Sequence, residues 1–229
     1  MIYFAHRGAS ASAPANTLPA FALARQQGAA HYELDVHLTR EGQLVVHHDY
    51  QIGGRLIAQM TAAEVKQYVI NAPQDGSFTA EVPLLREVFP VVADDLQLLN
   101  IEIKNDDNVY PGIEEAVWEA VQDFVPHSLH KLLFSSFDYP TLCRLRELAP
   151  KAQIGLLTRL FEPQQAHNLH AYSVHMNHTR ITKEIIDICH RENRRVFLYT
   201  VNDRYTAQKL AQLGADGIFT DKPSLFLPR

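Results

Sequence analysis

The chain has 229 residues, 46% of them hydrophobic, and a formal net charge of −5. This length supports one sizeable core, whereas the negative charge gives no electrostatic support for binding nucleic acid or an anionic membrane surface. No apolar stretch is long enough for a membrane span, and no charged leader precedes the few apolar residues at the start. We therefore expect a cytoplasmic protein with no integral membrane association and with one domain over residues 1–229.

In chain order, short apolar runs alternate with longer amphipathic ones. The first half predicts strands at 2–7, 31–39, 44–48 and 98–104, and helices at 18–27, 61–69, near 88–92 and at 113–124. Asn16 or Thr17 is expected to cap the first helix. Thr61, with Glu64 three residues later, has the spacing of a capping box. Segment 71–82 is the most loop-like part of the chain.

The second half repeats the alternation. It predicts strands at 132–137, 154–158, 173–177, 196–201 and 217–220, and helices at 140–148, 183–192 and 204–213. Such repeats indicate parallel strands joined by crossover helices. About eight units in this length favour the α/β class and a TIM-type (β/α)8 barrel over an open doubly wound sheet. The sequence also lacks the G-x-G-x-x-G and G-x-x-x-x-G-K motifs of open nucleotide-binding sheets.

Charged side chains occupy the inward face of two predicted strands. Because side chains alternate along a strand, Glu33, Asp35 and His37 share one face, and Glu102 and Lys104 share a face of a later strand. A buried carboxylate without a partner is costly, so these acids need a cation or hydrogen-bond donors. A Glu–Lys ion pair inside the barrel, or an exposed edge strand, is the structural alternative for either strand alone. The two strands together favour a metal-binding pocket.

The type of ligand indicates the class of metal. Three carboxylates without a cysteine suit a hard divalent cation, so we expect Mg²⁺ or Ca²⁺, with Mn²⁺ as a further candidate. Nearby histidines keep Zn²⁺ open as a less favoured choice. His37 shares the parity of the acids, but a lone strand histidine is more often structural.

Further histidines stand at the ends of predicted strands. His6 lies near the end of the first strand, and His47 and His48 end a later one. Barrel active sites gather at the C-terminal ends of the strands. Two imidazoles there can act as base and acid near neutral pH. Only one of the adjacent pair can face the site, and alternation along the strand does not choose between them.

Seven short motifs occur together along nearly the whole chain. The motifs are His6-Arg7-Gly8, Asn16-Thr17, Glu33-Leu34-Asp35, Val45-Val46-His47-His48-Asp49, Asn100-Ile101-Glu102-Ile103-Lys104, Tyr199-Thr200-Val201-Asn202 and Gly214-Ala215-Asp216-Gly217-Ile218-Phe219-Thr220-Asp221. Each is weak alone, but the ordered set resembles the glycerophosphodiester phosphodiesterase family.

The resemblance implies a (β/α)8 barrel that hydrolyses small glycerophosphodiesters to sn-glycerol 3-phosphate and an alcohol. It makes His6 and His48 the acid–base pair. It favours His48 over His47 because the family histidine directly precedes an aspartate. Asp49 is then expected to be a structural partner in the turn. The attacking group, either water or the 2-hydroxyl of the substrate, stays open, as does the histidine that acts first as base.

The resemblance also implies the roles of the charged residues. Glu33, Asp35 and Glu102 become the metal ligands, and Arg7 and Lys104 contact the phosphate. With one divalent cation and one phosphodiester bound, the charges of this set cancel. A buried site that is neutral with its substrate is physically reasonable, because uncompensated buried charge is costly.

Three departures from the family pattern bear on substrate preference. Ala15 stands where the family usually has glutamate, segment 52–56 differs from the usual Arg-Thr-Thr-like stretch, and Tyr199 replaces a common tryptophan. Tyr199 either lines the pocket as a substrate contact or packs in the core, and Phe137 has the same ambiguity. Ala15 lies outside the metal and proton-transfer sets, so its missing acid is not expected to abolish activity.

Two rival functions follow from the same residues. The first is a related phosphodiesterase that acts on lysophospholipids or phosphoinositides. A larger apolar patch at the mouth of the barrel would favour it, and loop 71–82 is the place to look for such a patch. A barrel that binds phosphodiesters without catalysis would lack a histidine or a carboxylate of the set. The two histidines and three carboxylates of the set are all present, which disfavours this non-catalytic barrel.

Overall fold

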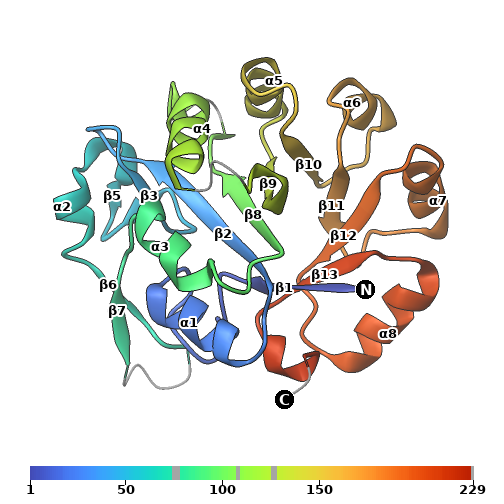
Figure 1. Ribbon diagram of the computed structural model, residues 1–229, viewed down its shortest axis with the longest axis horizontal. Coiled ribbons are helices and arrows are strands. Elements are labelled where there is room, and N and C mark those ends of the chain that lie inside the picture. The colour runs from blue at the N-terminus through green and yellow to red at the C-terminus, as the bar shows by residue number, and fades with distance from the viewer. Residues whose placement is uncertain (74–77, 107–108, 125–127, 228–229) are drawn as a thin grey trace.

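Parallel strands form a closed ring at the centre of the computed structural model, which describes residues 1–73, 78–106, 109–124 and 128–227 (Figure 1). Within these ranges, eight parallel strands pair in sequence around the ring, and β1 pairs with both β13 and β2, which closes it. The strands are β1 (Ile2–His6), β2 (His31–Leu38), β8 (Leu98–Ile103), β9 (Leu132–Ser136), β10 (Gln153–Thr158), β11 (Ser173–Asn177), β12 (Arg195–Tyr199) and β13 (Gly217–Thr220). The predicted TIM-type barrel is confirmed.

Helices surround this ring (Figure 1). They are α1 (Leu18–Gln26), α3 (Leu85–Val92), α4 (Ile113–Phe124), α5 (Tyr139–Leu148), α6 (Pro163–Asn168), α7 (Lys183–Arg191) and α8 (Arg204–Leu213). Local signals fix several ends: Asp138 caps α5, Asp203 caps α8, and Gly214, with φ +110°, ends α8 in the left-handed conformation that glycine adopts readily. The short 3₁₀ segments are η1 (Ile57–Gln59), η3 (Leu129–Lys131) and η4 (Pro223–Leu225).

Two layers of apolar side chains hold the barrel together. Outward residues such as Leu34 and Ile101 are fully buried against the helices. Inside the ring, Phe4 packs against Phe197 and Phe219, with ring centroids 5.0 and 4.7 Å away. This inner cluster fills the barrel interior, so the fold encloses a packed core and not a pore.

An excursion between β2 and β8 lies outside the ring. It contains β3 (Leu44–Val46), β4 (Gln51–Ile52), β5 (Arg55–Leu56), α2 (Ala62–Val65), β6 (Val69–Asn71) and β7 (Thr79–Glu81). β3 runs antiparallel to β2, and β6 and β7 form an antiparallel hairpin. Val45, Ile57, Met60 and Val65 form the fully buried centre of a small core of its own.

The differences from the predicted elements have physical causes. The capping box of Thr61 and Glu64 is present, but α2 ends at Val65, and the predicted helix 61–69 is wrong beyond that point because Val69 pairs with Glu81 in the hairpin. Part of the predicted loop 71–82 belongs to this hairpin, and residues 74–77 lie outside the described ranges. Helix α6 was missed because its sequence is polar and buries only Ala166, which leaves no helical apolar period.

Candidate active site

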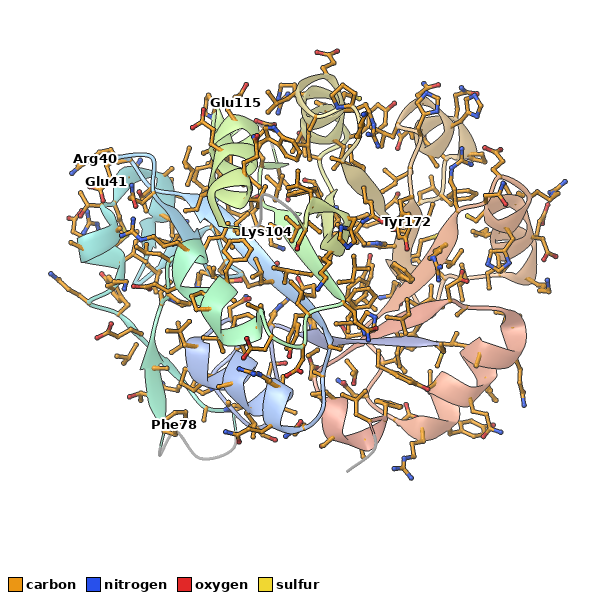
Figure 2. All side chains as sticks on the ribbon, viewed as in Figure 1. Arg40, Glu41, Phe78, Lys104, Glu115 and Tyr172 are labelled. Carbon is orange, nitrogen blue, oxygen red and sulfur yellow. The ribbon has the colours of Figure 1, made fainter. Side chains whose placement is uncertain are left out.

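A cavity of about 160 Å³ opens at the C-terminal ends of the barrel strands. Lys104 directly follows β8, and Figure 2 shows it beside β2 and β8. The cavity is lined by His6, Arg7, Glu33, His48, Asn100, Glu102, Lys104, Phe137, Leu157, His175, Tyr199, Thr200 and Phe219. Seven of the eight predicted site residues therefore line one cavity, and Asp35, the eighth, lies beneath it in contact with Arg7 and Lys104.

The three predicted carboxylates converge at one point. Glu33, Asp35 and Glu102 each offer an oxygen, and the three oxygens lie within 4.8 Å of one another. Adjacent strands explain this, since Asp35 on β2 is in register with Glu102 on β8. Oε1 of Glu33 is buried without a hydrogen-bond partner. A cluster of carboxylate oxygens with one unsatisfied buried member fits a hard divalent cation.

Two cations partly compensate this negative charge. Arg7 Nε lies 3.1 Å from Oδ2 of Asp35, and Lys104 Nζ lies 2.9 Å from Oδ1 of Asp35 and 2.5 Å from Oε1 of Glu102. The Glu–Lys pair considered as a structural alternative is therefore present, and it coexists with the carboxylate cluster. Asn16 adds a hydrogen bond from Nδ2 to Oδ2 of Asp35, at 2.8 Å.

The three carboxylates differ in the direction of their pKa shifts although they lie close together. Burial alone would raise the pKa of Asp35, but Lys104 and Arg7 outweigh it and hold that pKa below its usual range. Burial and the charge of Asp35 raise the pKa of Glu33, and burial raises the pKa of Glu102 to about 6. Negative charge therefore concentrates on Asp35, and the cluster as a whole is short of positive charge.

His6 is held by a carboxylate from the far end of the chain. Its Nδ1 lies 2.6 Å from Oδ1 of Asp221, while its Nε2 lies 3.9 Å from Oε2 of Glu33. Ser10 and Asn202 also donate hydrogen bonds to Asp221 and fix its orientation. Burial lowers the pKa of His6 although Asp221 opposes the shift. This bond fits a neutral imidazole that carries its proton on Nδ1 and presents a free Nε2.

His48, which follows β3, has a similar arrangement. Its Nδ1 lies 2.7 Å from Oδ1 of Asp49, which joins two exposed groups. The adjacent His47 does not line the cavity. His37 lies beneath, with Nδ1 2.9 Å from the Tyr110 hydroxyl and Nε2 3.2 Å from the backbone oxygen of His48. His37 thus has the contacts of a structural residue that positions the backbone of His48.

The far wall and floor of the cavity are less charged. Phe137 and Tyr199 meet edge to face, with centroids 6.2 Å apart. Both line the cavity, and Tyr199 also packs against the inner apolar cluster. On the floor, the His175 ring packs between Phe197 and Phe219, and its Nε2 lies 2.8 Å from the Ser173 hydroxyl.

Comparisons with known proteins agree with this geometry. Residues 6–225 match the model of the glycerophosphoryl diester phosphodiesterase family. The chain belongs to this family. A glycerophosphodiester phosphodiesterase of Caldanaerobacter subterraneus is 34% identical over 99% of the chain and 96% of its own length. The glycerophosphoryl diester phosphodiesterase family hydrolyses phosphoric diesters, and the protein is an enzyme of that kind.

Two solved structures are similar to this chain in fold and sequence. An Oleispira antarctica phosphodiesterase, in complex with its product sn-glycerol-3-phosphate, has a TM-score of 0.83 and 30% identity, over 98% of this chain and 94% of that one. A chain from Silicibacter pomeroyi has a TM-score of 0.87 and 24% identity over 97% of this chain and 90% of its own, which supports the barrel fold.

Two residues of the glycerophosphodiester phosphodiesterase site were missed by the sequence reasoning. Asp221 ends the last sequence motif, which predicts no role for it, although barrel closure brings the ends of the first and last strands together. Asn16 was expected to cap a helix, but its side chain bonds Asp35, and Thr17 at the cap position bonds the Pro14 carbonyl instead. No pattern in the sequence marked this contact, because it depends on how the loop after β1 folds.

Proposed function

We propose that the enzyme hydrolyses glycerophosphodiesters to sn-glycerol 3-phosphate and an alcohol, with His6 and His48 as the acid–base pair. The observation that carries the proposal is the matching orientation of the two imidazoles. Each Nδ1 is held by an aspartate, Asp221 or Asp49, so each ring has Nε2 left for proton transfer. Both rings line the cavity that contains the carboxylate cluster.

One divalent cation, Mg²⁺ or Ca²⁺, with Mn²⁺ as a further candidate, would be held by Glu33, Asp35 and Glu102. When bound, it would offset charge on the phosphoryl oxygens and satisfy the unpaired oxygen of Glu33. The preference for these ions rests on the all-carboxylate donor set.

Three residues of the chain would hold the substrate. Arg7 and Lys104 are fixed by Asp35 and face the cavity, so they supply positive charge that is already oriented toward a phosphate. Tyr199 on the opposite wall would contact the rest of the diester.

Proton movement then follows from the two rings. One Nε2 removes the proton of the attacking hydroxyl, whose oxygen forms a bond to phosphorus. The other ring, protonated on Nε2, gives that proton to the alkoxide whose bond to phosphorus breaks. If the attacking hydroxyl belongs to water, glycerol 3-phosphate forms directly; if it belongs to the substrate, a cyclic diester forms first and water then opens it. His6 is the more enclosed ring and neutral in its Asp221 contact, so we assign it the role of first base. Asp221 acts through His6 by holding its tautomer and direction.

The lysophospholipid alternative finds no support at the cavity. Neither strand of the β6–β7 hairpin lines it, and Phe78 lies far from Lys104 in Figure 2. In the part of the chain that the structure describes, no helix is long and apolar enough to span a bilayer. Residence in the cytoplasm is part of our proposal, and cell fractionation with an antibody to the protein tests it.

A metal-restoration assay tests the reaction. Protein dialysed against EDTA, with its residual metal measured by atomic emission, is assayed for release of glycerol 3-phosphate from several glycerophosphodiesters and a lysophospholipid. Activity should disappear with the metal and return with Mg²⁺, Ca²⁺ or Mn²⁺. Full activity in protein shown to contain no metal would refute the cation site.

Two substitutions test the acid–base pair. His6→Ala and His48→Ala should each lower kcat by at least ~10²-fold, the usual scale for acid–base catalysis. His47→Ala is the matched control, since His47 neighbours His48 and does not line the cavity. A His6 or His48 variant with the wild-type rate would remove that histidine from the mechanism.

A further inference from the structure

One wall of the cavity combines aromatic rings with a guanidinium. Phe137 follows β9 and Tyr199 ends β12, and the two rings stand nearly perpendicular at 88°. Arg159, just after β10, places its Cζ 4.5 Å from the centroid of the Phe137 ring. A cation at this distance is attracted by the ring face, so the aromatic ring already has a cationic partner from the protein.

The loop after β10 holds Arg159 in place. The hydroxyl of Thr158 accepts a hydrogen bond from the backbone nitrogen of Leu160, at 3.1 Å. Nη1 of Arg180, from the loop after β11, donates to the backbone oxygen of Arg159 at 3.3 Å. Two arginines from neighbouring strand ends therefore stand together at the rim.

Arg159 reaches the cavity through Phe137, which lines it, and Arg180 lies beside Arg159 through its bond to the Arg159 backbone. Burial raises the pKa of Tyr199, and the charge of Glu102 adds to this shift, whereas Arg159 and Arg180 oppose it. The acid in this set, Glu102, is paired with Lys104 on the other side of the cavity. The rim beside Tyr199 is therefore positive, and both arginines are exposed, so a ligand that leaves the cavity on this side meets them.

This arrangement discriminates by charge. Quaternary ammonium groups are usually bound by open aromatic faces. Here Phe137 could provide such a face, but Arg159 covers it, and a second cation would meet a like charge. A phosphate or carboxylate would instead find two guanidinium donors, which suit bidentate contacts with such groups.

We infer that this rim is a subsite for the alcohol portion of the substrate, and that it favours a polyol bearing a second anionic group over a cationic alcohol such as choline. The inference rests on the proposed diester hydrolysis and adds a substrate class to it. The phosphodiester would lie against Arg7 and Lys104, and the anionic group of the alcohol would lie against Arg159 and Arg180.

Three glycerophosphodiesters that differ in the alcohol test the preference: one with choline, one with glycerol and one with a polyol that carries a second phosphate. For the wild-type enzyme, kcat/KM should be highest for the phosphorylated polyol and lowest for choline. The ratio between these two should shrink as KCl rises from about 0.05 M to about 0.5 M, because salt screens exposed charges.

Substitutions then assign the preference to the rim. Arg159→Gln and Arg180→Gln should each reduce the ratio by about 2- to 5-fold, a range expected for exposed ion pairs. Arg159→Glu should reverse the order of the choline and phosphorylated substrates. Arg191→Gln is the matched control, since Arg191 ends α7 at the opposite end of the barrel and should leave the ratio unchanged.

Binding separates this inference from the proposed reaction. Dissociation constants of the same three diesters, measured by calorimetry with the His6→Ala variant, should follow the same order without turnover. Equal binding of the choline and phosphorylated compounds, or a ratio that both rim variants leave unchanged, would overturn the subsite. Absence of turnover with a preserved order of binding would count against the reaction alone.

Discussion

The buried histidine on the cavity floor makes stability depend on pH. His175 is about 1% exposed, and burial lowers its pKa to about 3, compared with 6.5 for an exposed imidazole. Between these two values the unfolded chain binds a proton that the folded chain does not, so stability falls as pH falls from about 6.5 toward 3. The contribution is present in full above pH 6.5.

The size of the effect follows from the shift. Each pKa unit corresponds to about 1.4 kcal/mol, so His175 should cost about 2 kcal/mol of unfolding free energy between pH 7.5 and pH 5.0. This figure holds for any folded pKa well below 5. In the His175→Gln variant, which keeps a polar group near Ser173, this portion of the pH dependence should vanish.

Urea denaturation of wild type and His175→Gln at pH 7.5 and 5.0 measures the effect. The variant should be the less stable protein at pH 7.5, because it loses ring packing against Phe197 and Phe219. Its deficit should shrink by about 2 kcal/mol at pH 5.0. All other titrating groups are common to both chains and cancel. A deficit of equal size at both pH values would refute the assignment of a buried neutral imidazole.

Three further predictions concern other parts of the site. Asp221→Asn should lower kcat by about 10²-fold with KM and melting temperature nearly unchanged, because His6 loses its orienting carboxylate; steady-state kinetics and a thermal melt check this. Gly155→Ala should destabilise the fold by about 1–3 kcal/mol in urea denaturation, since the new Cβ would lie 2.6 Å from the ring of His175. Ala15→Glu should leave kcat within about 3-fold of wild type, well short of the ~10²-fold scale of acid–base catalysis, because position 15 lies outside the metal and proton-transfer sets. If Ala15→Glu raised kcat from near zero to robust turnover, Ala15 would instead mark a site that is nearly inactive in the wild type.

Alternation along strands allowed much of the site to be predicted. The inward parity of Glu33, Asp35 and Glu102 follows from strand geometry, and parallel register then brings Asp35 beside Glu102. The choice of His48 over His47 depended on the family resemblance, and the structure places His48 at the cavity. The carboxylate cluster thus needed only short-range rules and the overall topology, whereas the histidine needed the resemblance.

The parts that could not be predicted depend on loops. Asn16 has a positive φ of +61° and reaches Asp35 from the loop after β1, a contact that no periodic pattern encodes. Arg159 reaches Phe137 in the same way from the loop after β10. The β6–β7 hairpin is stabilised by pairing between segments, which outweighed the local helical pattern before it.

The contact between His6 and Asp221 joins residues 215 positions apart. Residues 6 to 221 must therefore all be synthesised before this pair can form, and a fragment that stops before β13 would lack it however well it folded. Because the two strands are neighbours in space, a circular permutant that links the present ends and opens a distant surface loop should retain the pair. The permutant and the original chain would have the same final geometry but would form this pair at different points during synthesis. The order of synthesis would then decide when the enzyme first becomes active.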